Sequence, residues 1–413
     1  MQLLRWLVLL FSTLLSAQEP ILRAGIARVE ITPPLDHPMG GYATRKEGAK
    51  SKHDPLYATV LVLDSGSGSL AIVTCDLRSF VSAKVVEEAK KRHGIETTVI
   101  SVSHTHSGPL TWELRSPWYA EAEEKMLNAI GAAKRNLFPA QLALGKGEVY
   151  LGFNRRKVVN GRAEMWWRND TRAPSSPLDP SVQVLVVQDM QGEPRGILVN
   201  YACHPSVLGP DNLAFSADYP GALRTYVESQ VPNALLLFTQ GGAGDINPYR
   251  DKEPVKGEGF QAMEEMGAEL GKHVVALLSK AVRLPEGPLK TVSETVQVRH
   301  RWRPTESIDI GITAGLLGGG ACFLALPGEP FVEHQIAFRD KSECQFSLLF
   351  GYSYSAPGVW AGYLPTILAA VEGGYGADYN TTVEVGAGES LVDRGIVHLF
   401  RLRGLLKDLP GGN

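Results

Sequence analysis

The stretch TTVISVSHTHSGP, residues 97–109, carries the strongest structural signal in the chain. Its first half, Thr97 to Ser103, is rich in β-branched residues and is typical of a buried strand. His104 and His106 follow directly, before a Gly-Pro turn. If they continue the extended strand, side chains two apart point to the same face, and both imidazoles converge on one metal or one substrate. A solitary histidine is usually structural, whereas this pair at a strand end indicates a metal site.

Similar elements flank this stretch. Runs rich in Val, Ile and Leu predict further buried strands, and amphipathic segments between them predict helices. Gly94 is expected to close the first helix, and Ser116 with Pro117 to start the second. The alternation predicts an α/β fold with the site at strand ends. The expected strands are 58–64, 70–76, 182–188, 196–202 and 234–239, and the expected helices are 82–93, about 116–136 and about 261–280.

Glu286-Gly287-Pro288 is the best candidate for an internal boundary. A predicted helix stops there, and an alternating segment from Thr291 to His300 begins. The boundary is short, and candidate site residues lie on both sides of it. We therefore expect a loop within a single catalytic domain, residues 18–413.

Composition excludes several classes of function. The 413 residues are 44% hydrophobic and 21% charged, with 41 basic and 44 acidic residues and a net charge of -3. Such a chain buries a substantial core and is neither disordered nor fibrous. It has no block of like charge that would follow a phosphate backbone or dock on an anionic membrane, so no nucleic-acid partner is expected. The oligomeric state is not encoded in these features.

The N-terminus has the pattern of a signal peptide. Arg5 precedes an apolar run from Trp6 to Leu15, which is followed by Ser16-Ala17 and then a polar segment. A membrane anchor is the alternative, but a span needs roughly 20 apolar residues and this run is about half that. We expect residues 1–17 to be removed near Ala17 and the mature protein, without a transmembrane segment, to be secreted or periplasmic.

Export permits disulfides, yet the four cysteines do not form a dense framework. Cys75 and Cys203 lie in strand-like runs, and only Cys322 and Cys344 are plausible as a pair, with core packing as the default for all four. No CxxC motif is present. Any metal is therefore expected to have histidine and carboxylate ligands.

A second strand end also carries a histidine. The predicted strand that begins at Gly196 ends in His204-Pro205, and a polar loop leads on to Asp218 before Tyr219-Pro220. His204 is a candidate ligand, with a simple strand cap as the alternative. Asp218 would orient a ligand imidazole or cap a helix.

A glycine-rich loop follows the next strand. Residues 240–248 read QGGAGDINP, and their backbone N–H groups could face an anion, with a tight structural turn as the alternative. The loop lacks the Gly-Lys-Ser/Thr ending of a phosphate-binding P-loop, so no nucleotide is expected.

Three further candidates lie downstream. Glu329, in LPGEP at residues 326–330, is at a strand-to-helix junction, where it would bind a metal or favour the positive helix end. Tyr363 and Tyr375 lie in glycine-rich loops and would singly be ordinary packing residues.

These segments, in this order, resemble the catalytic domain of the neutral/alkaline ceramidases from about Gly25 to about Leu399. By that resemblance the chain would be a zinc-dependent hydrolase of an N-acyl amide bond, in ceramide or a related lipid, with mixed, stacked sheets covered by helices and the zinc site at strand ends. The zinc ligands would be His104, His204, Glu329 and Tyr363, and the substrate would be lined by His106, Arg155 and Tyr375. The motifs that carry the resemblance are Gly40-Gly41-Tyr42, His-Thr-His-Ser-Gly-Pro, Asn154-Arg155, the His204 strand, Gly-Asp-Ile-Asn-Pro, Pro-Gly-Glu and Gly-Tyr-Leu-Pro-Thr.

The chain departs from this family in two ways. Gly241-Gly242 stand where the family has a Ser-Asn pair with the serine in the active site, so only backbone and a little extra space are expected there. The sequence also stops near the end of the family's catalytic domain, without the C-terminal domain of characterised ceramidases. Two alternatives follow: a zinc hydrolase of another amide or ester on the same scaffold, or an exported binding protein without catalysis.

In the expected mechanism, a metal-activated water attacks the substrate carbonyl. His106 would shuttle a proton to the leaving amine, and Tyr375 or Arg155 would stabilise the developing oxyanion. The expected substrate is a small-molecule or lipid amide.

Overall fold

The computed structural model describes residues 22–111 and 116–406, so the predicted signal peptide lies outside the described residues. Its larger sheet has ten strands in the order β13-β11-β10-β6-β1-β3-β4-β5-β21, with β15 paired to β6. Neighbouring strands are antiparallel except for the pairs β4–β5 and β11–β13, which are parallel. The strands are β1 Arg23–Glu30, β3 Tyr57–Asp64, β4 Ser69–Cys75, β5 Thr97–Val102, β6 Phe138–Glu148, β10 Ser181–Asp189, β11 Pro194–Tyr201, β13 Leu235–Gln240, β15 Val282–Arg283 and β21 Ser353–Tyr354.

Both faces of this sheet are buried, which explains why its strands are continuous apolar runs. Val60 and Val62 of β3 pack towards the helices, whereas Leu61 and Leu63 face a second sheet. The expected strands are confirmed with shifts of one or two residues at their ends.

The second sheet has the order β16-β17-β18-β20 and packs on the larger one. Hydrogen bonds join the two sheets: Gln183 Nε2 donates to the Ser347 carbonyl at 2.7 Å, and Asn200 Nδ2 donates to the Leu349 carbonyl at 2.9 Å. The loop at residues 286–288 thus connects two sheets that share one core. The strands are β16 Leu289–His300, β17 Arg303–Leu317, β18 Ala321–Ala325 and β20 Phe346–Phe350.

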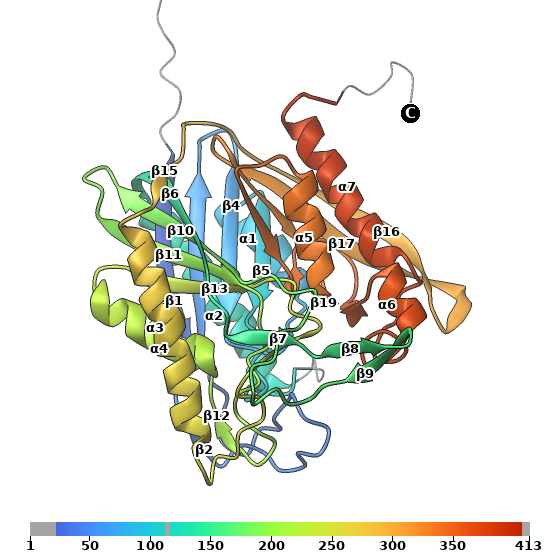
Figure 1. Ribbon diagram of the computed structural model, residues 1–413. Coiled ribbons are helices and arrows are strands. Elements are labelled where there is room, and N and C mark those ends of the chain that lie inside the picture. The colour runs from blue at the N-terminus through green and yellow to red at the C-terminus, as the bar shows by residue number, and fades with distance from the viewer. Residues whose placement is uncertain (1–21, 112–115, 407–413) are drawn as a thin grey trace, which may run out of the picture.

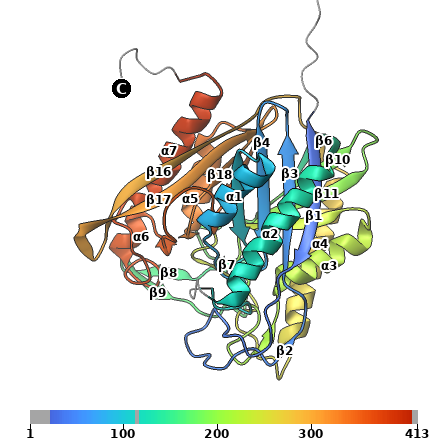
Figure 2. The same cartoon turned by 180° about the vertical axis from the view of Figure 1, so that it is seen from behind.

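Helices cover the outer faces of both sheets and give four layers. On the larger sheet lie α1, α2, α3 and α4, and on the smaller sheet α5 and α7. Figure 1 shows α5 and α7 on the side of β16 and β17, and Figure 2 shows α1 and α2 over β3 and β4. None of the described helices is long and apolar enough to span a bilayer. The helices are α1 Ala83–His93, α2 Pro117–Arg135, α3 Tyr219–Gln230, α4 Gly259–Leu278, α5 Val332–Lys341, α6 Ile367–Glu372 and α7 Ala387–Leu402.

The expected helix ends are confirmed by their capping. Ser82 Oγ accepts a hydrogen bond from Val85 N at 3.0 Å, and Gly94 closes α1 in the left-handed conformation with φ 64°. Ser116 caps α2 through Tyr119 N, and Pro117 is its first residue.

The cysteines differ among themselves. Cys322 of β18 and Cys344, in the loop after α5, form a disulfide, so the plausible pair is present and the default expectation of unbonded core packing is wrong for these two. Cys75 and Cys203 are buried free thiols in the core.

Short two-stranded ladders hold the loops at one end of the sheets. β19 and β22 are parallel and place Glu329 opposite Tyr363. At this end, the polypeptide leaves β4, β5, β11, β13 and β18 and enters the loops that carry the candidate residues. The strands of these ladders are β2 Ser51–Lys52 with β12 Ala214–Phe215, β7 Gly152–Asn154 with β14 Ile246–Pro248, β8 Arg156–Val159 with β9 Arg162–Met165, and β19 Glu329–Pro330 with β22 Tyr363–Leu364.

Candidate metal centre

His104 lies just beyond the end of β5 in an unexpected conformation. The strand ends at Val102, and His104 has φ 70°, so the expected extended continuation from His104 to His106 is wrong. The carbonyl of Leu77 accepts the N–H of His104 at 2.8 Å and holds this turn. The two imidazoles still converge, with ring centroids 5.2 Å apart.

His104 and His204 present the same ring nitrogen to the centre. Nδ1 of His104 donates to the Arg78 carbonyl at 2.6 Å, and Nδ1 of His204 donates to the Ile246 carbonyl at 3.2 Å. Because a carbonyl only accepts, each Nδ1 carries the hydrogen and each Nε2 keeps a free lone pair. A backbone carbonyl on the second nitrogen is the usual support of a metal-binding histidine.

Glu329 completes the group. Its Oε2 lies 3.4 Å from Nε2 of His104 and 3.4 Å from Nε2 of His204. All three atoms are buried and have no hydrogen-bond partner among the described residues. Burying three such acceptors together is unfavourable unless a cation binds them, so the arrangement fits a metal ion. Two nitrogens and one carboxylate oxygen are a donor set that suits zinc.

His106 lies beside these atoms. Ligand atoms of His104, His106 and His204 are all within 4.8 Å of one another. The structure therefore brings together the two histidines predicted as ligands and the one predicted for catalysis.

Electrostatics keeps these groups in their metal-binding forms. Burial lowers the pKa of His104 to about 3 and holds the pKa of His106 well below its ordinary value. Burial alone would raise the pKa of Glu329, but the neighbouring His104 and His204 hold it far below its ordinary value. At neutral pH His104 and His106 are therefore neutral, the form of an imidazole that binds a divalent cation.

Gln240, the last residue of β13, links the two histidine-bearing strand ends. Its Nε2 donates to the carbonyl of Cys203 at 2.7 Å and to that of Ser103 at 3.2 Å, while its Oε1 accepts from Cys203 N at 3.1 Å. Ser103 and Cys203 directly precede the two histidines. Sequence patterns did not single out Gln240, although a polar residue ending an apolar strand is a usable signal.

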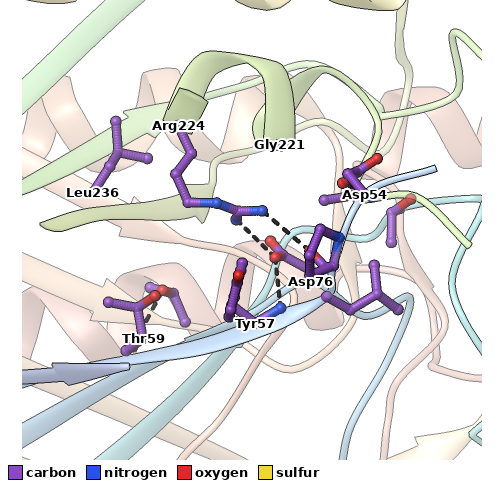
Figure 3. Close-up of polar contacts among 12 residues, drawn as sticks. Asp54, Tyr57, Thr59, Asp76, Gly221, Arg224 and Leu236 are labelled. Carbon is purple, nitrogen blue, oxygen red and sulfur yellow. Dashed lines mark hydrogen bonds and ion pairs between the residues drawn. The ribbon is translucent and has the colours of Figure 1, made fainter. Parts of the chain in front are cut away.

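A buried ion pair holds the loop beneath His104 (Figure 3). Asp76, directly after β4, accepts Nη1 of Arg224 from α3 at 2.7 Å and the N–H of Tyr57 at 2.8 Å. Burial raises the pKa of Asp76 although Arg224 opposes that change. The ion pair fixes the backbone at Asp76. The carbonyls of the next two residues, Leu77 and Arg78, accept hydrogen bonds from the backbone N–H and from Nδ1 of His104.

Arg155, Tyr363 and Tyr375 form an adjoining cluster. Arg155 Nη2 donates to the Tyr363 hydroxyl at 3.2 Å and to the Gly244 carbonyl at 2.7 Å. The guanidinium carbon lies 5.1 Å from the ring centre of Tyr375, and the two tyrosine rings are 5.4 Å apart. Burial alone would lower the pKa of Arg155, but Tyr363 and Tyr375 raise it, so the cation persists. All seven predicted site residues therefore lie in one region.

Asp218 and the glycine-rich loop at residues 240–248 each have a structural role and not the functional one that was considered. Asp218 caps α3 through Tyr219 N at 2.7 Å and accepts Leu208 N at 3.0 Å, so it does not orient an imidazole. In the glycine-rich loop, Gly242 N donates to Gln335 Oε1 at 2.7 Å, and Gly244 N donates to the Pro330 carbonyl at 2.8 Å. These N–H groups are used inside the protein, so the loop is a structural turn rather than an anion site.

The extra space expected at Gly241 is also absent from the described structure. A Cβ added there would lie 2.2 Å from Gln335 Oε1 and 3.1 Å from the Ala202 Cβ. The side chain of Gln335, from α5, fills the volume that a larger residue in the loop would need.

Comparisons with known proteins agree on one family. Residues 22–253 match the family described as neutral/alkaline non-lysosomal ceramidase, N-terminal. Neutral ceramidase A of Dictyostelium discoideum is 20% identical over 348 residues, which cover 69% of this chain and 47% of that protein. The chain thus spans about half the length of this curated relative.

Two solved structures have the same fold. The crystal structure of neutral ceramidase from Pseudomonas aeruginosa superposes with a TM-score of 0.76 at 16% identity, covering 96% of this chain and 76% of that chain. A ceramidase complexed with C2 gives a TM-score of 0.76 at 16% identity, covering 95% and 77%.

Proposed function

The chain belongs to the neutral/alkaline non-lysosomal ceramidase family, and from this premise we propose that it is an exported, zinc-dependent hydrolase of an N-acyl amide bond in ceramide or a related lipid. One observation supports the metal dependence above the others. Nε2 of His104 and Nε2 of His204 each lie 3.4 Å from Oε2 of Glu329, and all three buried atoms lack a hydrogen-bond partner in the described part of the chain.

The proposed zinc ligands are His104, His204, Glu329 and Tyr363. Tyr363 joins the set because it is the register partner of Glu329 across β19 and β22. A bound Zn²⁺ supplies a Lewis acid that polarises a carbonyl and makes water more acidic.

His106 is the proposed proton carrier. Its two ring nitrogens are buried without hydrogen-bond partners within residues 22–111 and 116–406, and its lowered pKa keeps it neutral. A neutral imidazole can accept a proton from the attacking water and deliver it to the leaving amine nitrogen. The ring lies 5.6 Å from that of His204.

Arg155 and Tyr375 are proposed to bind the substrate oxygen as it gains charge. Asn247 Oδ1 accepts Nη1 of Arg155 at 3.0 Å, which fixes the guanidinium before substrate arrives. A fixed cation in a buried site stabilises a developing oxyanion more strongly than one in water.

The identity of the substrate has a second candidate. Because Gln335 fills the volume beside Gly241 and its carboxamide is bonded to Gly242 and Asp179, this loop lacks the serine hydroxyl that the resembling family has there. A site without that polar group prefers a different partner. We therefore propose that long-chain ceramide is a poorer substrate than some smaller or differently headed amide or ester.

The test is a hydrolysis screen of the mature protein with N-acyl lipids, N-acyl sugars and simple esters, with and without a chelator. Chelator-sensitive cleavage of an amide supports the proposal, and kcat/KM on ceramide relative to the panel identifies the substrate class. If the zinc-loaded protein cleaves no member of the panel, it is a binding protein and the proposal is wrong. Efficient turnover of ceramide would instead favour the plain ceramidase assignment.

A further inference from the structure

Tyr352, in the loop between β20 and β21, lies against the metal centre. The residue is 1% exposed, and its hydroxyl is buried without a hydrogen-bond partner among the described residues. Tyrosine hydroxyls that are buried normally have a partner, because losing hydration without replacement is unfavourable. An unpartnered hydroxyl at a candidate catalytic centre indicates a group that interacts with a bound molecule.

The ring has a defined position relative to the proposed ligands. Its centroid is 4.6 Å from that of His104 and 6.1 Å from that of His204. The ring therefore adjoins both histidines that are proposed as ligands.

The backbone holds Tyr352 in this place at both ends. Its N–H donates to the Gly328 carbonyl at 2.8 Å, next to Glu329, and its carbonyl accepts Val102 N at 3.1 Å, at the end of β5. The residue is thus fastened to the two segments that carry the proposed ligands Glu329 and His104.

Its conformation is one that a bulky residue adopts rarely. Tyr352 has φ 56°, in the left-handed region. The preceding Gly351 lets the loop pass close to its neighbours, since an added Cβ would lie 2.6 Å from the Gly241 carbonyl oxygen and 2.9 Å from Pro330 Cγ. Backbone strain of this kind clusters at functional sites, where the surrounding structure maintains it.

We propose that the Tyr352 hydroxyl donates a hydrogen bond to the substrate carbonyl oxygen as that oxygen gains negative charge, which makes Tyr352 a further catalytic residue beside Arg155. This inference rests on the proposed hydrolase function. A phenol is protonated at neutral pH and is therefore a donor. The interaction strengthens as the carbonyl becomes an oxyanion, so it acts mainly on the transition state.

The test is Tyr352→Phe, which removes the hydroxyl and keeps the ring against His104. Loss of one oxyanion donor lowers kcat by about 10²–10³-fold, and we expect that loss with KM little changed. Zinc content should equal that of the wild type. Affinity for a phosphonamidate analogue of a short-chain N-acyl amide, measured by calorimetry, should fall by a similar factor, whereas affinity for the corresponding carboxylate should not.

Tyr354→Phe is the matched control. Tyr354 is two residues further on, 4% exposed and paired with Ile100 in the larger sheet. This variant removes a phenol from the same segment without touching the centre, and kcat and analogue affinity should stay at wild-type values.

Three results would overturn the inference. The first is wild-type kcat in Tyr352→Phe, and the second is loss of zinc in proportion to loss of activity, which would make Tyr352 a positioning residue for His104. The third is equal binding of the phosphonamidate by wild type and variant. Calorimetry needs no turnover, so a protein that cleaves nothing in the screen would refute the hydrolase proposal while leaving this comparison decisive for Tyr352.

Discussion

Gln335 Oε1 accepts a 2.7 Å hydrogen bond from Gly242 N and lies where a side chain on Gly241 would have to go. Gln335 Nε2 in turn donates to Asp179 Oδ2 at 2.7 Å, so the carboxamide is held at both ends. The loop after β13 and the helix α5 therefore pack closely and are joined by a side-chain hydrogen bond.

Replacing Gly241 with serine, together with Gly242→Asn, should destabilise the protein. The new Cβ would lie 2.2 Å from Gln335 Oε1, which must move and lose a buried hydrogen bond. Overpacking of this kind costs about 1–3 kcal/mol. Thermal denaturation should show a lower Tm, and adding Gln335→Ala should restore part of it. Gly257→Ser, in an exposed loop, is the control, and an unchanged Tm in the double variant would contradict the prediction.

The purified mature protein should contain about one zinc per chain. Two imidazoles, a carboxylate and a phenol would supply four donors, a number that zinc commonly takes. Chelation should lower both activity and Tm, because binding to the native state alone stabilises it. Elemental analysis that finds no stoichiometric metal, even after reconstitution with zinc, would refute the metal centre.

His104→Ala and His204→Ala should abolish turnover and weaken zinc retention, whereas His106→Ala should keep zinc and lower the rate. The expected loss for a missing proton carrier is roughly 10²–10⁴-fold. Metal analysis beside kcat separates the roles. Because His106 lies within 4.8 Å of the other two histidines, a variant that loses zinc would make His106 a ligand.

Local patterns predicted much of the fold, whereas the full set of candidate site residues came from the resemblance to the ceramidases. Ser82, Gly94 and Pro117 marked helix ends because capping depends on nearby residues. The conformation of His104 was not predictable, since it depends on a carbonyl of Leu77 that only tertiary folding brings near.

Gln240 and Tyr352 were missed for a related reason. Gln240 begins the glycine-rich loop, but its hydrogen bonds to Ser103 and Cys203 depend on the folded chain, and the contacts of Tyr352 with His104 do too. Likewise, the space beside Gly241 depends on Gln335, a residue of another element. Sequence patterns predict which residues lie at the end of a strand, whereas tertiary packing determines which side chains they contact.

Cys344→Ser should lower the free energy of unfolding by about 3 kcal/mol. This value follows from the loss of chain entropy that a disulfide imposes on the unfolded chain, for cysteines 22 residues apart. The bond ties β18 to the loop after α5, on the smaller sheet. Urea denaturation of the variant and of the reduced wild type should give equal losses. Unchanged denaturation midpoints in both would show that the bond does not contribute to stability.

Glu333→Gln should change how stability depends on pH. Burial raises the pKa of Glu333 to about 8, and the charge of Asp245 adds to this effect. The folded protein thus binds this proton more tightly than the unfolded chain, whose glutamate titrates near 4.3, so wild-type stability should fall as pH rises from about 4 to about 8. Glutamine does not titrate, so the Glu333→Gln variant should lack this contribution to the pH dependence of stability.

The check is urea unfolding of wild type and Glu333→Gln at pH 5, 7 and 9. The variant should become the more stable of the two at pH 9, with little difference at pH 5. Glu286→Gln, at an exposed position, should follow the wild type at all three values. A constant difference between wild type and Glu333→Gln across the series would show that Glu333 does not titrate in this range.

Glu329 and Tyr363 are held opposite each other by a parallel ladder, in which Glu329 N donates to the Gly362 carbonyl at 2.8 Å and Phe331 N donates to the Leu364 carbonyl at 3.1 Å. Their separation is set by strand pairing and not by the length of chain between them. Insertions and deletions in the connecting loops can therefore accumulate during evolution without moving either side chain. A slip of one residue in the ladder, by contrast, would put glycine or leucine in the place of the tyrosine.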